Sequence, residues 1–255
     1  MKTQLRRNLI LIVLVGLVTF IAQAEPLEIL VEDANAPWSY ADGTGYVNEA
    51  IKEAFLAVKI PVTLKVVPYS RCKFLVMEGK TVACASMSRL IELEGLVQFP
   101  DQPFYITQFI YFQRKKQPAV VQSENELGQG MTVGVVNGYE YPGSAYQAQQ
   151  RGATFENGRS DEVNLQKLAQ GRINLALVST NNMEPPEIKV SQAGVQNEVI
   201  YAFSSGSLNT YIGFSVHHEK GLWALGKFNE GFKLISTNGT LKRLKSQWFG
   251  GSVTH

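Results

Sequence analysis

The sequence contains few of the residues that bind metals or act as nucleophiles in enzymes. Its 255 residues include two cysteines and three histidines. His217 and His218 are adjacent, but no group of Cys, His or Asp residues with the spacing of metal ligands surrounds them. No Ser/His/Asp or Cys/His arrangement stands out either. We therefore expect no metal site, no cofactor and no catalytic residue.

Long hydrophobic runs are also missing once the first 24 residues are set aside. Those 24 begin with three cations, continue with the apolar run 9–21 and end in the small residues Ala22-Gln23-Ala24. This pattern predicts a secretory signal cleaved after Ala24, and the apolar run is short for a transmembrane helix. The alternative is an uncleaved anchor helix, which the polar break at Glu25-Pro26 disfavours.

An excess of charge of one sign is missing as well. Removing residues 1–24 takes away three cations and no acids, so the formal charge falls from +2 to −1. No basic stripe suggests a nucleic-acid partner. Glu25, not Cys, follows the predicted cut, which argues against a lipid anchor. We expect a monomer in the periplasm, without membrane insertion after signal cleavage.

The two cysteines, Cys72 and Cys84, leave two readings open. In an oxidising compartment they can form a disulfide, which for so short a loop would contribute about 3 kcal/mol. They can equally be two small buried thiols. In either case we expect them to lie close together, because the helix starting near Cys72 feeds the strand that carries Cys84.

The hydrophobic pattern predicts an α/β protein built from two strand–helix sets and a helical tail. The first set has strands at 27–32, 61–68 and 81–86, with helices at 46–58 and from Ser70, as a cap, to 78. A long strand at 104–114 follows. The second set has strands at 131–136, 173–178 and 211–216, with helices at 146–151 and 161–170; residues 183–186 break the pattern. The tail has helices at 222–235 and 241–248.

Several short stretches together resemble the family 3 extracellular solute-binding proteins, the polar amino-acid type that serves ABC importers. The resemblance covers essentially the whole mature chain. It rests on residues 27–31 (LEILV), 36–40 (APWSY), 45–50 (GYVNEA), 68–71 (PYSR), 78–80 (EGK), 96–100 (LVQFP), 103–105 (PFY), 133–135 (VGV) with Gly138, 171–176 (GRINLA), 238–241 (NGTL) and 248–250 (WFG).

The resemblance implies a two-lobed periplasmic-binding-protein fold of type II, with a two-strand hinge and the ligand between the lobes. Residues 25–116 and 204–255 would form lobe 1, and residues 117–203 would form lobe 2. We expect two separate sheets, not one continuous sheet through both halves.

In such a fold the ligand meets strand ends and helix N-termini, where backbone N–H groups and helix dipoles favour polar or anionic groups. Two of the candidate residues have a plain structural alternative: Trp38 could stack on a ligand or plug lobe 1, and Gly138 could admit a ligand or merely form a turn. The candidate ligand contacts are Glu32, Asn35, Trp38, Ser86, Ser88 and Arg89 in lobe 1, and Asn137, Gly138, Tyr139, Glu140 and Ser179 in lobe 2.

Two positions depart from the family's amino-acid-binding pattern. Leu93 stands where such members usually carry an arginine for the ligand carboxylate, and Ser179 stands where they carry an aspartate for the ammonium. Arg89 lies one helical turn before Leu93 and could substitute for the arginine. We therefore expect ordinary α-amino acids to bind weakly or not at all.

The leading functional hypothesis is a non-enzymatic protein that captures a small polar solute and delivers it to the membrane permease of an ABC importer. One alternative is a periplasmic dehydratase-like enzyme on the same fold, with Glu32 or Glu140 as general acid. Another is a ligand sensor for a membrane receptor. Fold alone does not decide among these three classes.

Overall fold

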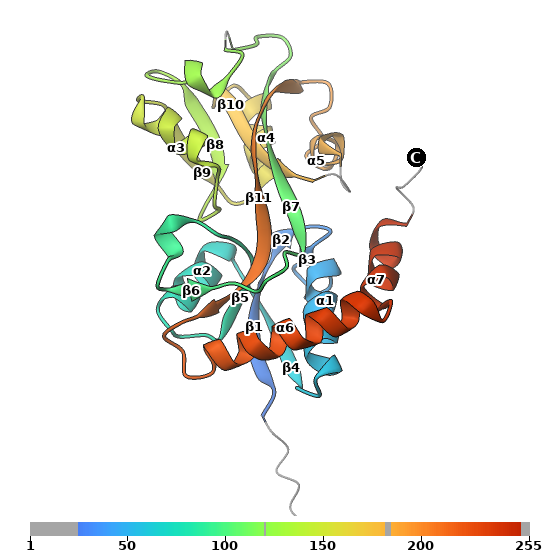
Figure 1. Ribbon diagram of the computed structural model, residues 1–255. Helices are drawn as coiled ribbons and strands as arrows, with labels where there is room; N and C mark the ends of the chain where they lie inside the picture. Colours follow the sequence, from blue (N-terminus) through green and yellow to red (C-terminus); the bar gives the residue numbers. More distant parts are fainter. Residues whose placement is uncertain (1–24, 120, 182–184, 251–255) are drawn as a thin grey trace, which may run out of the picture.

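A computed structural model describes residues 25–119, 121–181 and 185–250 of the chain. The predicted signal sequence and its cleavage site lie outside the described residues. Figure 1 shows two lobes, one above the other, and the long strands β7 (Tyr105–Arg114) and β11 (Val199–Ser215) run between them. The predicted mixed α/β architecture with a two-strand connection is confirmed.

Lobe 1, the lower lobe in Figure 1, contains the chain's beginning and end. Along the chain, strands and helices alternate as predicted, and a small hairpin follows the first strand. Its elements are β1 (Leu27–Glu32), β2 (Ala34–Asn35), β3 (Ser39–Tyr40), α1 (Tyr46–Ala57), β4 (Val62–Val67), α2 (Tyr69–Met77), β5 (Ala83–Ser88), the 3-10 turn η1 (Ile91–Leu93), β6 (Val97–Gln98), α6 (Gly221–Thr237) and α7 (Thr240–Phe249).

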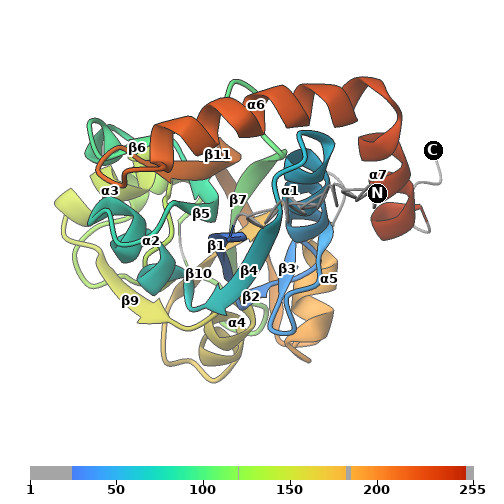
Figure 2. The ribbon, with the colours of Figure 1, turned by 90° about the horizontal axis from the view of Figure 1, so that it is seen from below.

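Strands β1 and β5 of lobe 1 are buried on both faces. In β1, Ile29 and Val31 pack into a core with α1 and α6, whereas Leu30, between them, packs into a second core with α2. This alternation follows from the two-residue period of a strand. Figure 2 shows α6 lying along one side of the lobe and α2 on the other side of β1.

Lobe 2, the upper lobe, repeats the arrangement. On β10 (Leu175–Thr180), Leu177 packs into the core beneath α3 (Gly143–Gln150), and Val178 packs into the opposite core with α4 (Asp161–Ala169). Ser160 caps α4, because its hydroxyl accepts a hydrogen bond from the Val163 N–H. The remaining elements are η2 (Glu124–Glu126), β8 (Thr132–Val136), β9 (Thr154–Gly158) and α5 (Pro186–Gln192).

Strand pairing is continuous through both lobes, in the order β4-β1-β5-β11-β7-β10-β8-β9, with β6 on β11. The expectation of two separate sheets is therefore wrong. The physical reason is that β7 and β11 pair from Tyr105–Thr210 at one end to Arg114–Val199 at the other, and each lobe adds its own strands to this shared ribbon. β7 already pairs with lobe 2 strand β10 from Gln108 onward, so the first crossing lies inside β7.

Four details of the prediction need correction. Helix α2 begins at Tyr69 after Pro68, and the expected Ser70 side-chain cap is not formed. β11 is much longer than the predicted 211–216, and β9 was not predicted. α5 was not predicted either; it begins at Pro186, the last residue of the expected break, and proline's fixed φ suits the start of a helix.

Cys72 on α2 and Cys84 on β5 form a disulfide, with their Cα atoms 5.5 Å apart. Both side chains are fully buried between the helix and the sheet. The bridge ties α2 to β5, and these two elements carry Lys73 and Ser88 to the junction of the lobes.

Candidate functional site

A small cavity lies where the two lobes and the connecting strands meet. Its volume is about 30 Å³, which is room for a few water molecules. Hydroxyl, amide, aromatic and charged side chains share its wall. The lining comprises Asn35, Trp38, Ser86 and Ser88 from lobe 1, Tyr105, Thr107, Phe109 and Thr210 from β7 and β11, and Tyr139, Glu140, Ser179, Thr180, Asn181 and Lys189 from lobe 2.

Glu32 lies just behind this wall at the end of β1 and is 1% exposed. Asn35 Nδ2 donates to its Oε1 at 2.6 Å, and the Tyr139 hydroxyl, from lobe 2, donates to its Oε2 at 3.0 Å. Burial raises the pKa of Glu32 to about 7, although these two hydrogen bonds favour the charged form. Glu32 therefore joins the lobes, and with this pKa it holds a proton below neutral pH and loses it above.

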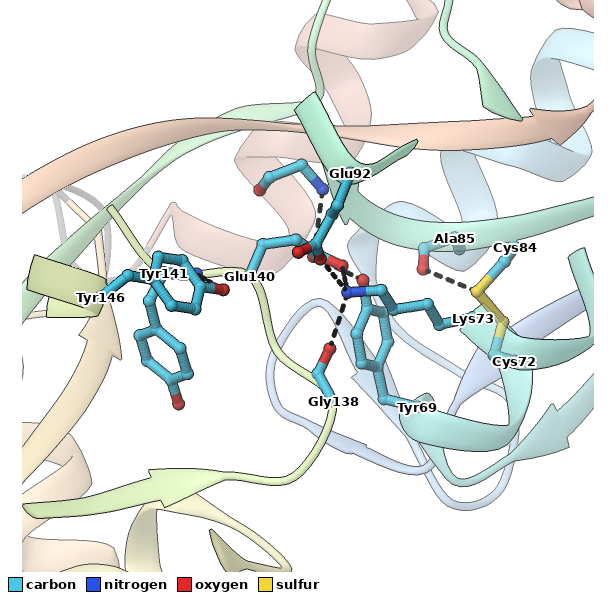
Figure 3. Close-up of polar contacts among 11 residues, drawn as sticks. Tyr69, Cys72, Lys73, Cys84, Ala85, Glu92, Gly138, Glu140, Tyr141 and Tyr146 are labelled. Carbon is cyan, nitrogen blue, oxygen red and sulfur yellow. Dashed lines mark hydrogen bonds and ion pairs between the residues drawn. A yellow bond between two sulfur atoms is a disulfide. The ribbon is translucent and has the colours of Figure 1, made fainter. Parts of the chain in front are cut away.

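Glu140 makes a second connection, shown in Figure 3. This lobe 2 carboxylate accepts hydrogen bonds from the Tyr69 hydroxyl at 2.6 Å and the Ser88 backbone N–H at 3.3 Å, and it pairs with Lys73 Nζ at 2.8 Å. Burial raises the pKa of Glu140, and the ammonium of Lys73 offsets part of this rise. Lys73 also pairs with Glu92 at 3.0 Å.

A third charged group lies inside lobe 2. Asp161, at the first position of α4, accepts a hydrogen bond from the Ser179 hydroxyl at 2.6 Å and lies 3.7 Å from Lys189 Nζ. Lys189, which also pairs with Glu162 at 3.7 Å, is a cation in the cavity wall. Burial raises the pKa of Asp161 to about 6, although Lys189 and Ser179 favour the carboxylate.

Trp38 combines the two readings that the sequence left open. Its ring stacks on Tyr105 at 3.9 Å between centroids and packs edge-on against Tyr46, as part of the lobe 1 core. The same side chain lines the cavity, although it is 2% exposed. The stacking partner in this structure is thus a protein ring, and Trp38 forms a rigid aromatic floor.

Seven of the predicted ligand contacts line the cavity, and a further two border it. Glu32 lies behind the wall, and Asn137 lines a neighbouring groove between the lobes. The seven are Asn35, Trp38, Ser86, Ser88, Tyr139, Glu140 and Ser179.

The structure assigns Arg89 and Gly138 to other contacts. The Arg89 guanidinium donates to the Pro100 carbonyl at 2.6 Å and packs over the Tyr211 ring, so Arg89 is not a cavity contact. Gly138 approaches lobe 1: a Cβ there would lie 2.9 Å from Ser70 Cα, and its carbonyl accepts from Lys73 at 3.3 Å. Both corrections arise because each group has a protein partner nearer than the cavity.

Several cavity residues were not among the predicted contacts. Tyr105, Thr107 and Phe109 belong to β7, which the sequence predicted as a strand without assigning it ligand contacts. Side chains two residues apart share one face of a strand, and this two-residue period was the available signal. Lys189 follows the expected break and carried no recognisable motif. The other unpredicted lining residues are Thr180, Asn181 and Thr210.

The described part of the chain contains no group of three or more His, Cys, Asp or Glu side chains that could hold a metal ion. Among the same residues, no helix has both the length and the apolar character needed to cross a bilayer.

No protein-family model matches the sequence, and no curated protein matches it significantly. Solved structures do match. A histidine kinase sensor domain with similarity to periplasmic binding proteins aligns with a TM-score of 0.73 at 15% identity, over 89% of this chain and 96% of that one. An ancestral arginine-binding protein bound to arginine aligns at 0.72 and 19% identity, over 88% and 98%.

The arginine-, lysine-, histidine-binding protein ArtJ from Geobacillus stearothermophilus also aligns, with a TM-score of 0.72 at 16% identity, over 89% of this chain and 96% of that one. These likenesses show that the chain has the two-lobed periplasmic-binding-protein fold. The resemblance read from the sequence is thus confirmed at the level of the fold. Because this fold serves both a sensor domain and binding proteins, the choice of function depends on the site.

Proposed function

We propose that the protein binds a small polar solute between its lobes, as family 3 solute-binding proteins do, and delivers it to the permease of an ABC importer. The observation that supports this most is the cavity, whose wall takes hydrogen-bonding groups from lobe 1, lobe 2 and both connecting strands. A solute held there contacts both lobes at once, so it favours their closed arrangement. An importer can then recognise that arrangement.

The proposal includes a monomer in the periplasm, released by cleavage after Ala24. It also includes the division into residues 25–116 and 204–255 for lobe 1 and residues 117–203 for lobe 2. Binding is favoured over catalysis because the two acidic groups considered as general acids have structural partners: Glu140 pairs with Lys73, and Glu32 accepts from Asn35 and Tyr139.

Ordinary α-amino acids should bind weakly. Leu93 is fully buried in the lobe 1 core, and Arg89 is held by Pro100 and Tyr211. The Ser179 hydroxyl donates to Asp161. None of these side chains therefore offers a charge to a ligand carboxylate or ammonium. Calorimetry with the twenty standard amino acids tests this point, and micromolar binding of any of them would contradict it.

The first experiment is a thermal-shift screen of residues 25–255 against a broad set of polar metabolites. A solute that binds the folded state at one hundred times its Kd stabilises it by about 2.7 kcal/mol. Hits are confirmed by calorimetry, and incubation with each hit followed by product analysis tests for turnover. No hit across the set would contradict the proposal.

Ser86 supplies a matched test of the site. Its Oγ is buried and makes no well-directed hydrogen bond with the described residues, although it lies near enough to Glu32 to lower the pKa of that carboxyl; its φ of 65° is rare for a residue other than glycine. Such strain often accompanies a functional site. We expect Ser86→Ala to weaken binding of a confirmed solute about fivefold, as loss of about 1 kcal/mol would. Arg89→Ala, outside the cavity, should leave the affinity unchanged; equal effects of the two variants would place the site elsewhere.

A further inference from the structure

Glu140 extends from lobe 2, but the three groups that hold its carboxylate all belong to lobe 1. They are the Tyr69 hydroxyl, the Lys73 ammonium and the Ser88 backbone N–H. Glu140 is 4% exposed, so these contacts take the place of water around the charge. A hydroxyl, an ammonium and a backbone N–H converging on one carboxylate make a set of charge-assisted hydrogen bonds.

These donors are fixed by lobe 1 itself. Tyr69 and Lys73 lie on the same side of α2, four residues apart, and Ser88 ends β5. The disulfide between Cys72 and Cys84 ties these two elements together next to the donors. Glu92 holds Lys73 from the solvent side at 3.0 Å. Lys73 also donates to the Gly138 carbonyl of lobe 2 at 3.3 Å, but the positions of all three donors are set by α2, β5 and Glu92 within lobe 1.

We propose that Tyr69, Lys73 and Ser88 form a carboxylate-binding site on lobe 1. Glu140 fills this site as an internal ligand and so holds the lobes closed without solute. Another carboxylate can occupy the site when Glu140 is absent or withdrawn. The inference deepens the proposed function and rests on it, because closing of the lobes has a functional role only if a solute binds between them.

The cavity supports this reading. With the lobes as close as they are here, the cavity of about 30 Å³ is too small for a metabolite, so the lobes must separate to admit one and then close again around it. Separation withdraws Glu140 from its donors. Glu140 thereby determines specificity: in the closed form it excludes an incoming carboxylate from this end of the cavity.

Chemical rescue tests the proposal. In Glu140→Ala, acetate can supply the missing carboxylate to the lobe 1 donors. We expect this variant to be less compact than the wild type by small-angle X-ray scattering and to have a Tm lower by on the order of 5–10 °C. Acetate, but not chloride at equal ionic strength, should restore both values. If Glu140→Ala does not fold in chloride, its refolding yield is compared between acetate and chloride, and the yield should be higher in acetate.

Three controls make the test decisive. Glu92→Gln removes the other acid beside Lys73 and leaves the cavity intact, so it should show no acetate effect. Lys73→Met, added to Glu140→Ala, should abolish rescue. Glu140→Gln keeps the side-chain volume but lacks the charge, so it should be less compact than wild type. A compact Glu140→Gln, or an acetate effect equal in wild type and Glu140→Ala, would overturn the proposal.

The result is separable from that of the proposed function. A confirmed metabolite in the thermal-shift screen with no acetate rescue would reject the carboxylate site and retain solute binding. Rescue without any metabolite hit would retain the carboxylate site and reject solute binding as proposed.

Discussion

Glu32 shows how one buried side chain sets a pH dependence. Its pKa rises from 4.5 to about 7 because burial disfavours the carboxylate. Between these two values the folded protein holds a proton that the unfolded chain has already released. Raising the pH through this window therefore lowers the free energy of unfolding, by about 3 kcal/mol in total.

We expect Glu32→Gln to lack this decline. Between pH 4.5 and 7.5 the difference in free energy of unfolding between variant and wild type should shift by about 3 kcal/mol in favour of the variant. Urea denaturation at closely spaced pH values measures it. Glu28→Gln, on the same strand but exposed, serves as the control and should parallel the wild type. Parallel profiles for Glu32→Gln and wild type would contradict the argument.

At the same scale, half of the cavity wall could be predicted, whereas the cations Lys73 and Lys189 that pair with nearby carboxylates could not. Ser86, Ser88 and Tyr139 were predicted because they follow strands whose ends meet at the junction of the lobes. Arg89 was predicted by the same reasoning, but its side chain does not line the cavity, because it contacts the Pro100 carbonyl and the Tyr211 ring instead. A sequence position fixes where a Cα lies in such a fold, but not which of several partners a long side chain reaches.

The connection between α2 and β5 gives a prediction for a whole element. The disulfide joins residues twelve apart in sequence. Reduction should lower the free energy of unfolding by about 3 kcal/mol, mainly because the unfolded chain gains freedom. Guanidinium denaturation with and without reductant measures this change. A Cys72→Ser/Cys84→Ser variant should equal the reduced wild type and show no further effect of reductant.

Elements were predicted well where their own residues carry the pattern. β1, β4 and α4 have strong periodicity or a capping serine, and the sequence places each within two residues of its observed bounds. β11 was shortened because Ser204-Ser205-Gly206-Ser207 has the composition of a loop. Pairing with β7 keeps this stretch within a strand, with register shifts between Tyr201 and Phe203 and between Ser204 and Ser207. Pairing with a strand distant in sequence thus overrides the loop preference of this stretch, and the local sequence pattern does not reveal such pairing.

For the whole molecule, the closeness of the two lobes depends on a glycine. Gly138 has φ +85°, and a Cβ there would lie 2.9 Å from the Cα and Cβ atoms of Ser70 on the other lobe. Alanine at this position should cost free energy in two ways: its backbone would be strained at this φ, and its Cβ would clash with the other lobe. Gly130 has nearly the same φ, +83°, but a Cβ there would have no neighbour within 4 Å. Comparing alanine variants at Gly138 and Gly130 therefore separates the cost of backbone strain from the cost of the contact between the lobes.

We expect Gly138→Ala and Gly130→Ala to lose similar free energy from the strained backbone, about 1 kcal/mol each. Only Gly138→Ala should also open the lobes, because separation relieves the contact with Ser70 while each lobe stays folded. Small-angle X-ray scattering should give a larger radius of gyration for Gly138→Ala than for Gly130→Ala or wild type. The opened variant should also weaken binding of a confirmed solute, since part of the binding free energy must restore closure. If both variants scatter like the wild type, the lobes can close without the Gly138 approach, and closure must depend on other contacts between the lobes, such as those of Glu140 with Lys73 and of Tyr139 with Glu32.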